Sequence, residues 1–323
     1  MDNIQPKGGL GTAFFGALFG VIVLAFIQII SAVVSGNDVR VIPTLVFDSH
    51  PLKFIGDYLG YFFTTLPGLI FLVVTILCYI AATYYVQKSV APPGKTDVEE
   101  HDTSGTMRRW LIGLNSGMNF ILAYNIYRVW FGDTVGLVIA IGLFALGFLA
   151  TFKGVSKNLA YQGIIGWLCW GAPMSWVIFL LGFLLFVLNL IGGLVGLVGV
   201  DVFKLGGDDS KSSTAHATVK GKILTADWAT GTFFLIGGIV GNLNPEETAF
   251  NMGTFGFIHS KDDHDDRKHE AGHNLNLFVY GWINHLIGAV DENIVGYGSR
   301  SISDRMAESH HTPSSDPTLE VWE

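Results

Sequence analysis

Long apolar runs in the N-terminal part of the chain constrain its fold more than any other feature. A helix needs about 20 apolar residues to cross the roughly 30 Å of hydrocarbon in a bilayer. Residues 11–34, 60–86, 134–152 and 174–200 meet or approach that length. Only 14% of the residues are charged, against about a quarter in soluble domains, and the mean hydropathy is +0.45. We therefore expect an α-helical polytopic membrane domain at residues 1–205.

A further apolar run, residues 110–128, decides the expected topology. It contains Asn115, Asn119 and Asn125, so it is either a span that faces other helices or an interfacial helix. Five spans with a cytoplasmic N-terminus place most of the Lys and Arg of the short loops in the cytoplasm, as the positive-inside tendency favours. With four spans, the part of the chain after the last span lies on the opposite side of the membrane. The sequence thus predicts an integral membrane protein of four or five spans, with an extracytoplasmic C-terminal domain if there are five.

The composition changes after these runs, which indicates a second domain. Residues 206–216 are rich in Gly, Asp and Ser and are typical of a linker. Strand-like patterns then occupy residues 217–224, 232–240 and 249–259, and helical patterns occupy residues 268–290 and 301–310. Strands followed by helices predict a small α+β domain at residues 217–310, with a polar tail at 311–323.

The helical pattern at 268–290 begins with the motif His269-Glu270-Ala271-Gly272-His273. Side chains four residues apart share one face of a helix, so both imidazoles can hold a divalent ion, most often zinc. The carboxylate of Glu270 lies beside them and can reach a water molecule at the ion. Eight of the ten histidines fall after residue 215, outside the predicted spans. We therefore predict a centre for one Zn²⁺ ion rather than two incidental surface histidines.

The motif helix, with a strand before it and an acidic helix after it, resembles the zincin metallopeptidases. The resemblance covers residues 249–310 and is closest to the glutamate-zincin type and to bacterial membrane proteins with a His-Glu-x-Gly-His helix. It implies that His269 and His273 bind zinc and that Glu270 activates water. It also implies that the strand at 249–259 pairs with an extended substrate, and that the protein lies in a bacterial inner membrane.

The third zinc ligand has several candidates in the acidic C-terminal part. Asp304 and Glu308 lie one helical turn apart, and such a carboxylate pair provides a ligand and a group that orients it. The pair resembles the second motif of membrane zincins, although Asp304 stands where that motif usually has glutamate. Glu292 is the alternative, and His310 is a further one. We favour the 304–308 segment.

Other residues are candidates for binding the substrate or stabilising an oxyanion. They are Tyr280, His285, Arg305 and His310, and the sequence does not choose among them.

These observations predict a membrane-anchored zinc-dependent metallopeptidase. Glu270 would accept a proton from the attacking water and pass it to the leaving amine. The expected partners are the lipid bilayer, a peptide or protein substrate, and other membrane proteins. No Lys/Arg-rich patch is present, so nucleic-acid binding is not expected.

Two other functions compete with this prediction. The unusual Asp304 and the open choice of third ligand favour a non-catalytic structural or assembly subunit of a membrane complex, with a zincin-like domain. One feature favours a transporter or channel, namely the polar residues Asn115, Asn119 and Asn125 within an apolar segment.

Overall fold

The structure, a computed structural model, describes six stretches of the chain, which are mostly helical and include one small sheet. The described residues are 51–89, 101–156, 158–197, 224–241, 249–259 and 267–291. The helices are α2 (Pro51–Thr64), α3 (Leu66–Ser89), α4 (His101–Phe131), α5 (Asp133–Leu149), α6 (Lys153–Ser156), α7 (Leu159–Leu168), η1 (Cys169–Gly171), η2 (Pro173–Ser175), α8 (Trp176–Leu197), α10 (Gly238–Gly241) and α11 (Arg267–Val290). The strands are β1 (Leu224–Asp227), β2 (Thr232–Ile236), β3 (Ala249–Met252) and β4 (Phe255–Ile258). The predicted order, helices first and then a small sheet with a further helix, is confirmed.

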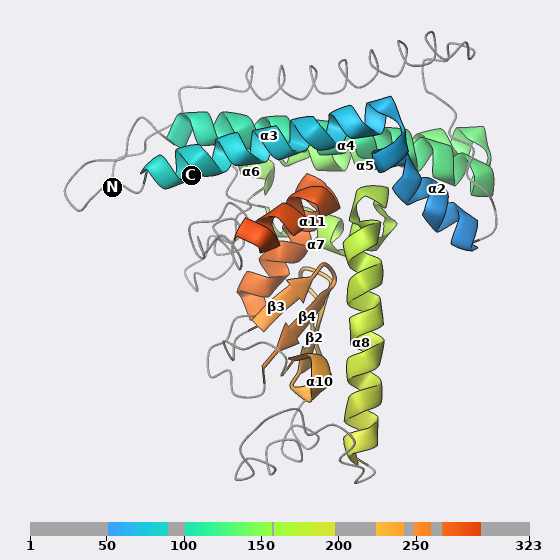
Figure 1. Ribbon diagram of the computed structural model, residues 1–323, viewed down its shortest axis with the longest axis vertical. Coiled ribbons are helices and arrows are strands. Elements are labelled where there is room, and N and C mark those ends of the chain that lie inside the picture. The colour runs from blue at the N-terminus through green and yellow to red at the C-terminus, as the bar shows by residue number, and fades with distance from the viewer. Residues whose placement is uncertain are drawn as a thin grey trace.

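Helix α4 is an interior helix that lies beside α3 and α5 (Figure 1). Its side chains from Arg108 to Ile126 are nearly all buried. Gly147 of α5 approaches so closely that an added Cβ would lie 2.7 Å from the Ser116 hydroxyl oxygen. Only glycine permits that approach. The segment 110–128, predicted as a span or an interfacial helix, is therefore part of the protein core.

The asparagines of α4 bind backbone groups, two of them in neighbouring elements and one within α4 itself. The Asn115 amide donates to two carbonyls of α11, and Asn119 Oδ1 accepts from the Met174 amide at 2.9 Å. Asn125 donates to the Ile121 carbonyl, one turn earlier in α4, at 2.8 Å. The residues that hinted at transport thus have a structural explanation, because buried polar groups need such partners.

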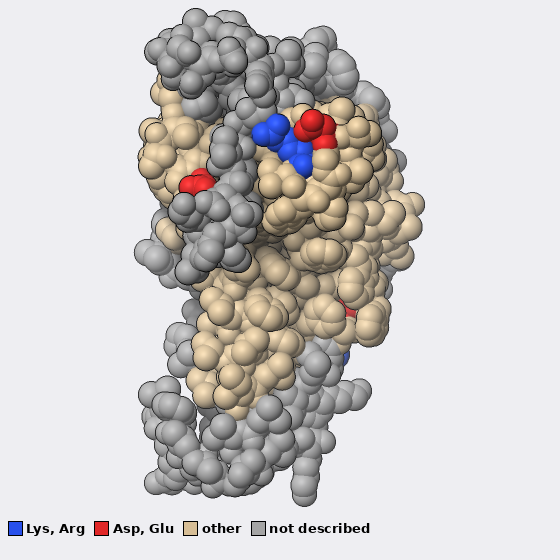
Figure 2. Space-filling model, turned by 90° about the vertical axis from the view of Figure 1, so that its right-hand side faces the viewer, with Lys and Arg blue, Asp and Glu red and all other residues tan. Residues whose placement is uncertain are grey.

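Helix α8 runs crosswise to α3, α4 and α5 and lies along the sheet (Figure 1). Its other side is apolar and exposed, and includes Leu180, Leu181, Leu184, Leu188 and Ile191. Figure 2 shows a face of the molecule on which the described surface carries few charged side chains. The crosswise arrangement of α8 differs from the roughly parallel bundle that four or five spans would form.

Membrane-length helices are fewer than predicted in the part that the structure describes. Pro173–Ile191, which contains most of α8, is long and apolar enough to cross a membrane. Gly56–Thr64 and Gly68–Ala81 would form a second span if counted together, but they are bent by 71° at their junction. Asp133–Leu149 is apolar but has only 17 residues. The predicted span at 11–34 lies outside the described residues. By length and composition, one or two helices qualify.

The sheet has the strand order β1-β2-β4-β3, and α8 and α11 pack on its two faces. β2 and β4 are parallel, and each edge strand is antiparallel to its neighbour. Successive residues of a strand point to opposite faces. Leu235 and Phe257 therefore cluster with Phe186 of α8, whereas Phe234 and Ile258 cluster with Ala271 of α11.

Two strand predictions need correction, and a third is tested only at its end. The predicted strand at 249–259 is a hairpin of β3 and β4, which turns at Gly253 with φ of 70°. The run at 232–240 is β2 followed by the short helix α10, because Gly237 and Gly238 have positive φ and end the strand. β1 begins at Leu224, and the rest of the strand predicted at 217–224 lies outside the described residues.

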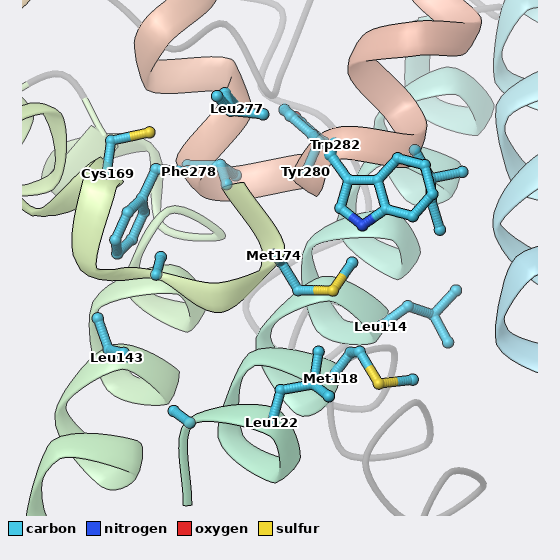
Figure 3. Packing of buried hydrophobic residues seen from close by; sticks show 14 of the residues in the cluster. Leu114, Met118, Leu122, Leu143, Cys169, Met174, Leu277, Phe278, Tyr280 and Trp282 are labelled. Atoms are coloured by element: carbon cyan, nitrogen blue, oxygen red, sulfur yellow. The ribbon is translucent and has the colours of Figure 1, made fainter. Parts of the chain in front are cut away.

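Helix α11 joins the sheet to the helical part. Leu277 and Phe278 of α11 belong to the same buried cluster as Met118 of α4 and Met174 of η2 (Figure 3). The linker predicted at 206–216 lies outside the described residues, so the division into domains stays a prediction. The elements on either side of it share one hydrophobic core.

Candidate metal centre

His269 and His273 converge as the motif predicts. Their Nε2 atoms are 3.2 Å apart, and their ring centres are 4.9 Å apart. Two nitrogens bound to one tetrahedral zinc at about 2.0–2.1 Å lie about 3.3 Å from each other. The two imidazoles lie within hydrogen-bond distance of each other, and the same separation would suit a shared metal ion.

The sheet holds the motif turn of α11 in place. The Asn251 side chain of β3 donates to the Glu270 carbonyl at 2.8 Å. Asn274, one residue after the motif, donates to the Thr230 carbonyl in the β1–β2 turn at 3.1 Å. Ala271 packs on the sheet, and a larger side chain there would push the helix away. The motif is consequently a rigid, mostly buried part of the fold.

Burial sets the protonation of the motif. His273 is 6% exposed, and its pKa lies well below 6.5 because burial disfavours the charged ring. Positive charge on His269 or His285 would lower that pKa further. His273 is therefore neutral at pH 7, which is the form of imidazole that binds metals. Glu270 is also buried, at 4% exposure.

His285 joins this group from the C-terminal half of α11. Its ring centre is 6.2 Å from that of His273, and its Nε2 lies 3.4 Å from the Asn251 carbonyl oxygen. Burial lowers the pKa of His285 to about 4, although the bond to Asn251 works in the opposite direction. Of the predicted substrate or oxyanion residues, His285 is thus the one that the described structure places beside the motif.

Strand β3 is an edge strand next to the motif. Among the described strands it pairs with β4 alone, and it contacts α11. An edge strand presents unpaired backbone groups that can bind another extended chain. The edge strand that the zincin resemblance implies therefore corresponds to β3 alone, not to the whole of residues 249–259.

Tyr280 lies two helical turns beyond His273 on the same face of α11, which is about 10 Å along the axis. It is buried, and burial raises the pKa of its hydroxyl, while Arg108 and Arg109 of α4 oppose that rise. Tyr280 therefore lies at the interface with the helical layer rather than beside the two motif histidines.

The third ligand stays a prediction, because the structure does not describe the residues proposed for it. Glu292, Asp304, Glu308 and His310, and also Arg305, lie outside the described residues. Among the residues that are described, no three His, Cys, Asp or Glu side chains are close enough to bind one ion as they stand. Asp291, next to Glu292, lies with its Oδ2 3.4 Å from the Tyr79 hydroxyl of α3. Burial raises the pKa of this carboxyl group.

The residues present nevertheless fit a zinc ion in several respects. Two imidazole nitrogens have a suitable separation, a buried carboxylate adjoins them, and Nδ1 of the nearby His285 is buried without a hydrogen-bond partner. Neither the contact of Asn251 with the motif nor the break at Gly281 that positions His285 was predicted from the sequence. The one signal for the break was an isolated glycine within a helical pattern.

The chain matches no family model, no curated protein and no solved structure. Functional inference therefore depends on the residues and their geometry.

Proposed function

We propose that this chain is a membrane-anchored, zinc-dependent metallopeptidase of the zincin-like type. The observation that carries the proposal is the 3.2 Å separation of the His269 and His273 Nε2 atoms on a buried helix. The position of this pair beside the edge strand β3 supports a peptide as the substrate.

Each residue has a distinct task in this proposal. His269 and His273 hold the ion, which when bound polarises a carbonyl group and makes water more acidic. Glu270 accepts the proton of the attacking water and passes it to the leaving amine. β3 pairs with the backbone of an extended peptide, and Asn251 of β3 keeps the strand in register with the motif helix through the Glu270 carbonyl. The acidic ligands Asp304, Glu308 and Glu292 stay predictions.

The membrane anchor is supported by the exposed apolar side of α8. A continuous run of exposed leucine and isoleucine side chains is costly in water and favourable in lipid. In our proposal Pro173–Ile191 crosses the membrane, and Gly56–Ala81 is a second, bent candidate. A total of four or five spans, the bacterial inner membrane and an extracytoplasmic site stay predictions.

The decisive experiment compares Glu270→Gln with the wild type, both purified as full chains in detergent. We expect about one zinc per chain in each, because the ligands are unchanged, and a loss of peptide hydrolysis of about 10²–10⁴-fold in the variant. Metal content by mass spectrometry and cleavage of a fluorogenic peptide library measure the two quantities.

Asp133→Asn is the matched control, because Asp133 is an exposed carboxylate of α5 with its side chain 81% exposed. It should change neither zinc content nor hydrolysis. A wild-type chain without zinc, or equal hydrolysis by Glu270→Gln, would contradict the proposal.

A non-catalytic assembly subunit is the second candidate function. The lack of a three-ligand set among the described residues favours it. If it is correct, Glu270→Gln supports the same cellular phenotype as the wild type, whereas disrupting α8 does not.

A further inference from the structure

Five of the eight tryptophans of the chain lie around the beginning of α8. Trp176 is the first residue of α8, and its indole N–H donates to the Trp170 carbonyl at 2.9 Å. Trp130, in the last turn of α4, stacks on Trp176 with ring centres 6.4 Å apart. We call Trp130, Trp167, Trp170, Trp176 and Trp228 the tryptophan group.

The other two members are joined to α8 by the segment that leads into it. Trp167 of α7 stacks on Trp228 of the β1–β2 turn with ring centres 5.6 Å apart, and its N–H donates to the Trp228 carbonyl at 3.0 Å. α7 continues through η1 and η2 into α8. No tryptophan occurs between residues 177 and 227. The indole rings are therefore concentrated at one end of α8, the upper end in Figure 1.

Most of the tryptophan group is exposed in spite of its size. Trp130 is 52% exposed, Trp170 55% and Trp228 71%. Phe131, next to Trp130, is exposed as well, whereas Trp282 in the core is only 5% exposed. Single exposed apolar side chains are normal, but a patch of large rings that pack on one another marks a surface that binds a partner.

The patch continues into the exposed apolar side of α8. Leu180 and Leu181 lie about one turn after Trp176. The exposed side extends to Ile191, roughly 22 Å along the axis from the first residue of the helix. None of residues 158–200 is charged. A protein partner in water is usually bordered by a polar rim, and this stretch offers no charged one. Lipid hydrocarbon needs no such rim, so the partner that fits is a bilayer.

The tryptophan end of this surface combines rings with polar groups. Indole and phenol rings have an apolar body and a polar edge, which is why Trp and Tyr are enriched where hydrocarbon meets water. Tyr127, beside the group, donates its hydroxyl to the Gly171 carbonyl. The guanidinium carbon of Arg128 lies 5.6 Å from the centre of the Tyr124 ring, and a nitrogen lies 4.0 Å from the Asp133 carboxylate. A guanidinium group at this level can also reach lipid phosphates.

We infer that the tryptophan group lies in the headgroup layer of a phospholipid bilayer, at the level where α8 enters the hydrocarbon. The indole rings occupy the boundary between headgroups and acyl chains, and Arg128 extends toward the phosphates. The group thereby fixes the depth of α8 in the membrane. This inference rests on the membrane anchor of the proposed function and not on its metal centre.

The test measures the depth of the rings in a membrane. The full chain is reconstituted into phosphatidylcholine vesicles that carry bromine, which quenches tryptophan fluorescence on contact, either near the headgroups or deep in the acyl chains. Trp170→Phe and Trp228→Phe each remove one exposed indole and keep an aromatic ring. We expect each variant to lose roughly one eighth of the emission of the eight tryptophans, and the lost part should be the part that shallow bromine quenches most.

Trp282→Phe is the matched control. Its ring is buried and packs edge-on against Phe62 of α2, with ring centres 5.4 Å apart. This variant should also lose emission, but the part quenched by brominated lipid should stay as in the wild type.

Three results would overturn the inference. Unchanged lipid quenching in both Trp170→Phe and Trp228→Phe would mean that other rings face the lipid. Loss of a part that deep bromine quenches most would place the group in the hydrocarbon interior. Quenching of the group by acrylamide in water, with none by lipid, would leave the surface to water or to a protein partner.

The measurement does not depend on zinc or on hydrolysis. Glu270→Gln should therefore show the same quenching as the wild type. If the tryptophan group does not lie among the headgroups, the metallopeptidase proposal is still decided by zinc content and peptide cleavage. If Glu270→Gln hydrolyses peptides as well as the wild type does, the position of the tryptophan group is unaffected.

Discussion

The two halves of α11 are positioned in different ways. Residues 267–280 carry the motif, pack on the sheet and would form a helix with the same spacing in most surroundings. Residues 282–290 carry His285, and their direction depends on the angles at Gly281 and on Asn115 of another helix. The local spacing of the motif thus brings its two histidines together, whereas a contact with a distant helix places His285 beside them.

Among the variants that test this difference between the two halves of α11, Gly281→Val should have the largest effect on stability. A β-branched side chain at φ of 80° and ψ of 172° is strongly strained, and its Cβ would displace the Asn115 oxygen. We expect a loss of stability of more than about 3 kcal/mol, measured by denaturant unfolding in detergent. His269 and His273 should stay paired, because their half of α11 packs on the sheet.

Gly281→Ala tests the same point if the valine variant does not fold. Its loss of stability should be smaller than that of Gly281→Val, because alanine adds only the Cβ that would meet Asn115 Oδ1. A Gly281→Ala variant as stable as the wild type would contradict a break fixed at this glycine.

Asn115→Ala should have the next largest effect. It leaves the buried Phe278 and Val279 carbonyls without the Asn115 donor, which costs about 2 kcal/mol. Asn189→Ala, which also removes a buried asparagine bound to the backbone, should cost a similar amount. Denaturant unfolding in detergent measures both losses, and an unchanged stability of Asn115→Ala would contradict its role at the end of the half-helix.

The sequence predicts the motif half of α11 well because its information is local. The helix predicted at 268–290 is α11 at 267–290, and the convergence of His269 and His273 is confirmed. The break was missed because a lone glycine in a helical pattern is usually tolerated. Its consequence depends on Asn115, which lies far away in the sequence.

Among the residues that the structure describes, fewer helices qualify as spans than predicted, for a related reason. A helix that is apolar on all sides is either buried in protein or embedded in lipid, and hydropathy does not distinguish the two. α4 is surrounded by other parts of the protein. α8, by contrast, has an exposed apolar side and lies in a segment that is long and apolar enough to cross a membrane.

The smallest effect should come from Asn251→Ala, which acts on the motif half. Asn251 donates to the Glu270 carbonyl, but that carbonyl lies inside a regular stretch of helix and keeps its own helical partner. We expect a loss of about 1 kcal/mol, less than for Asn115→Ala, where the carbonyls end a half-helix. The zinc affinity should change little, because both motif histidines are retained. A loss of stability larger than that of Asn115→Ala would mean that the motif half, too, depends on a single distant contact.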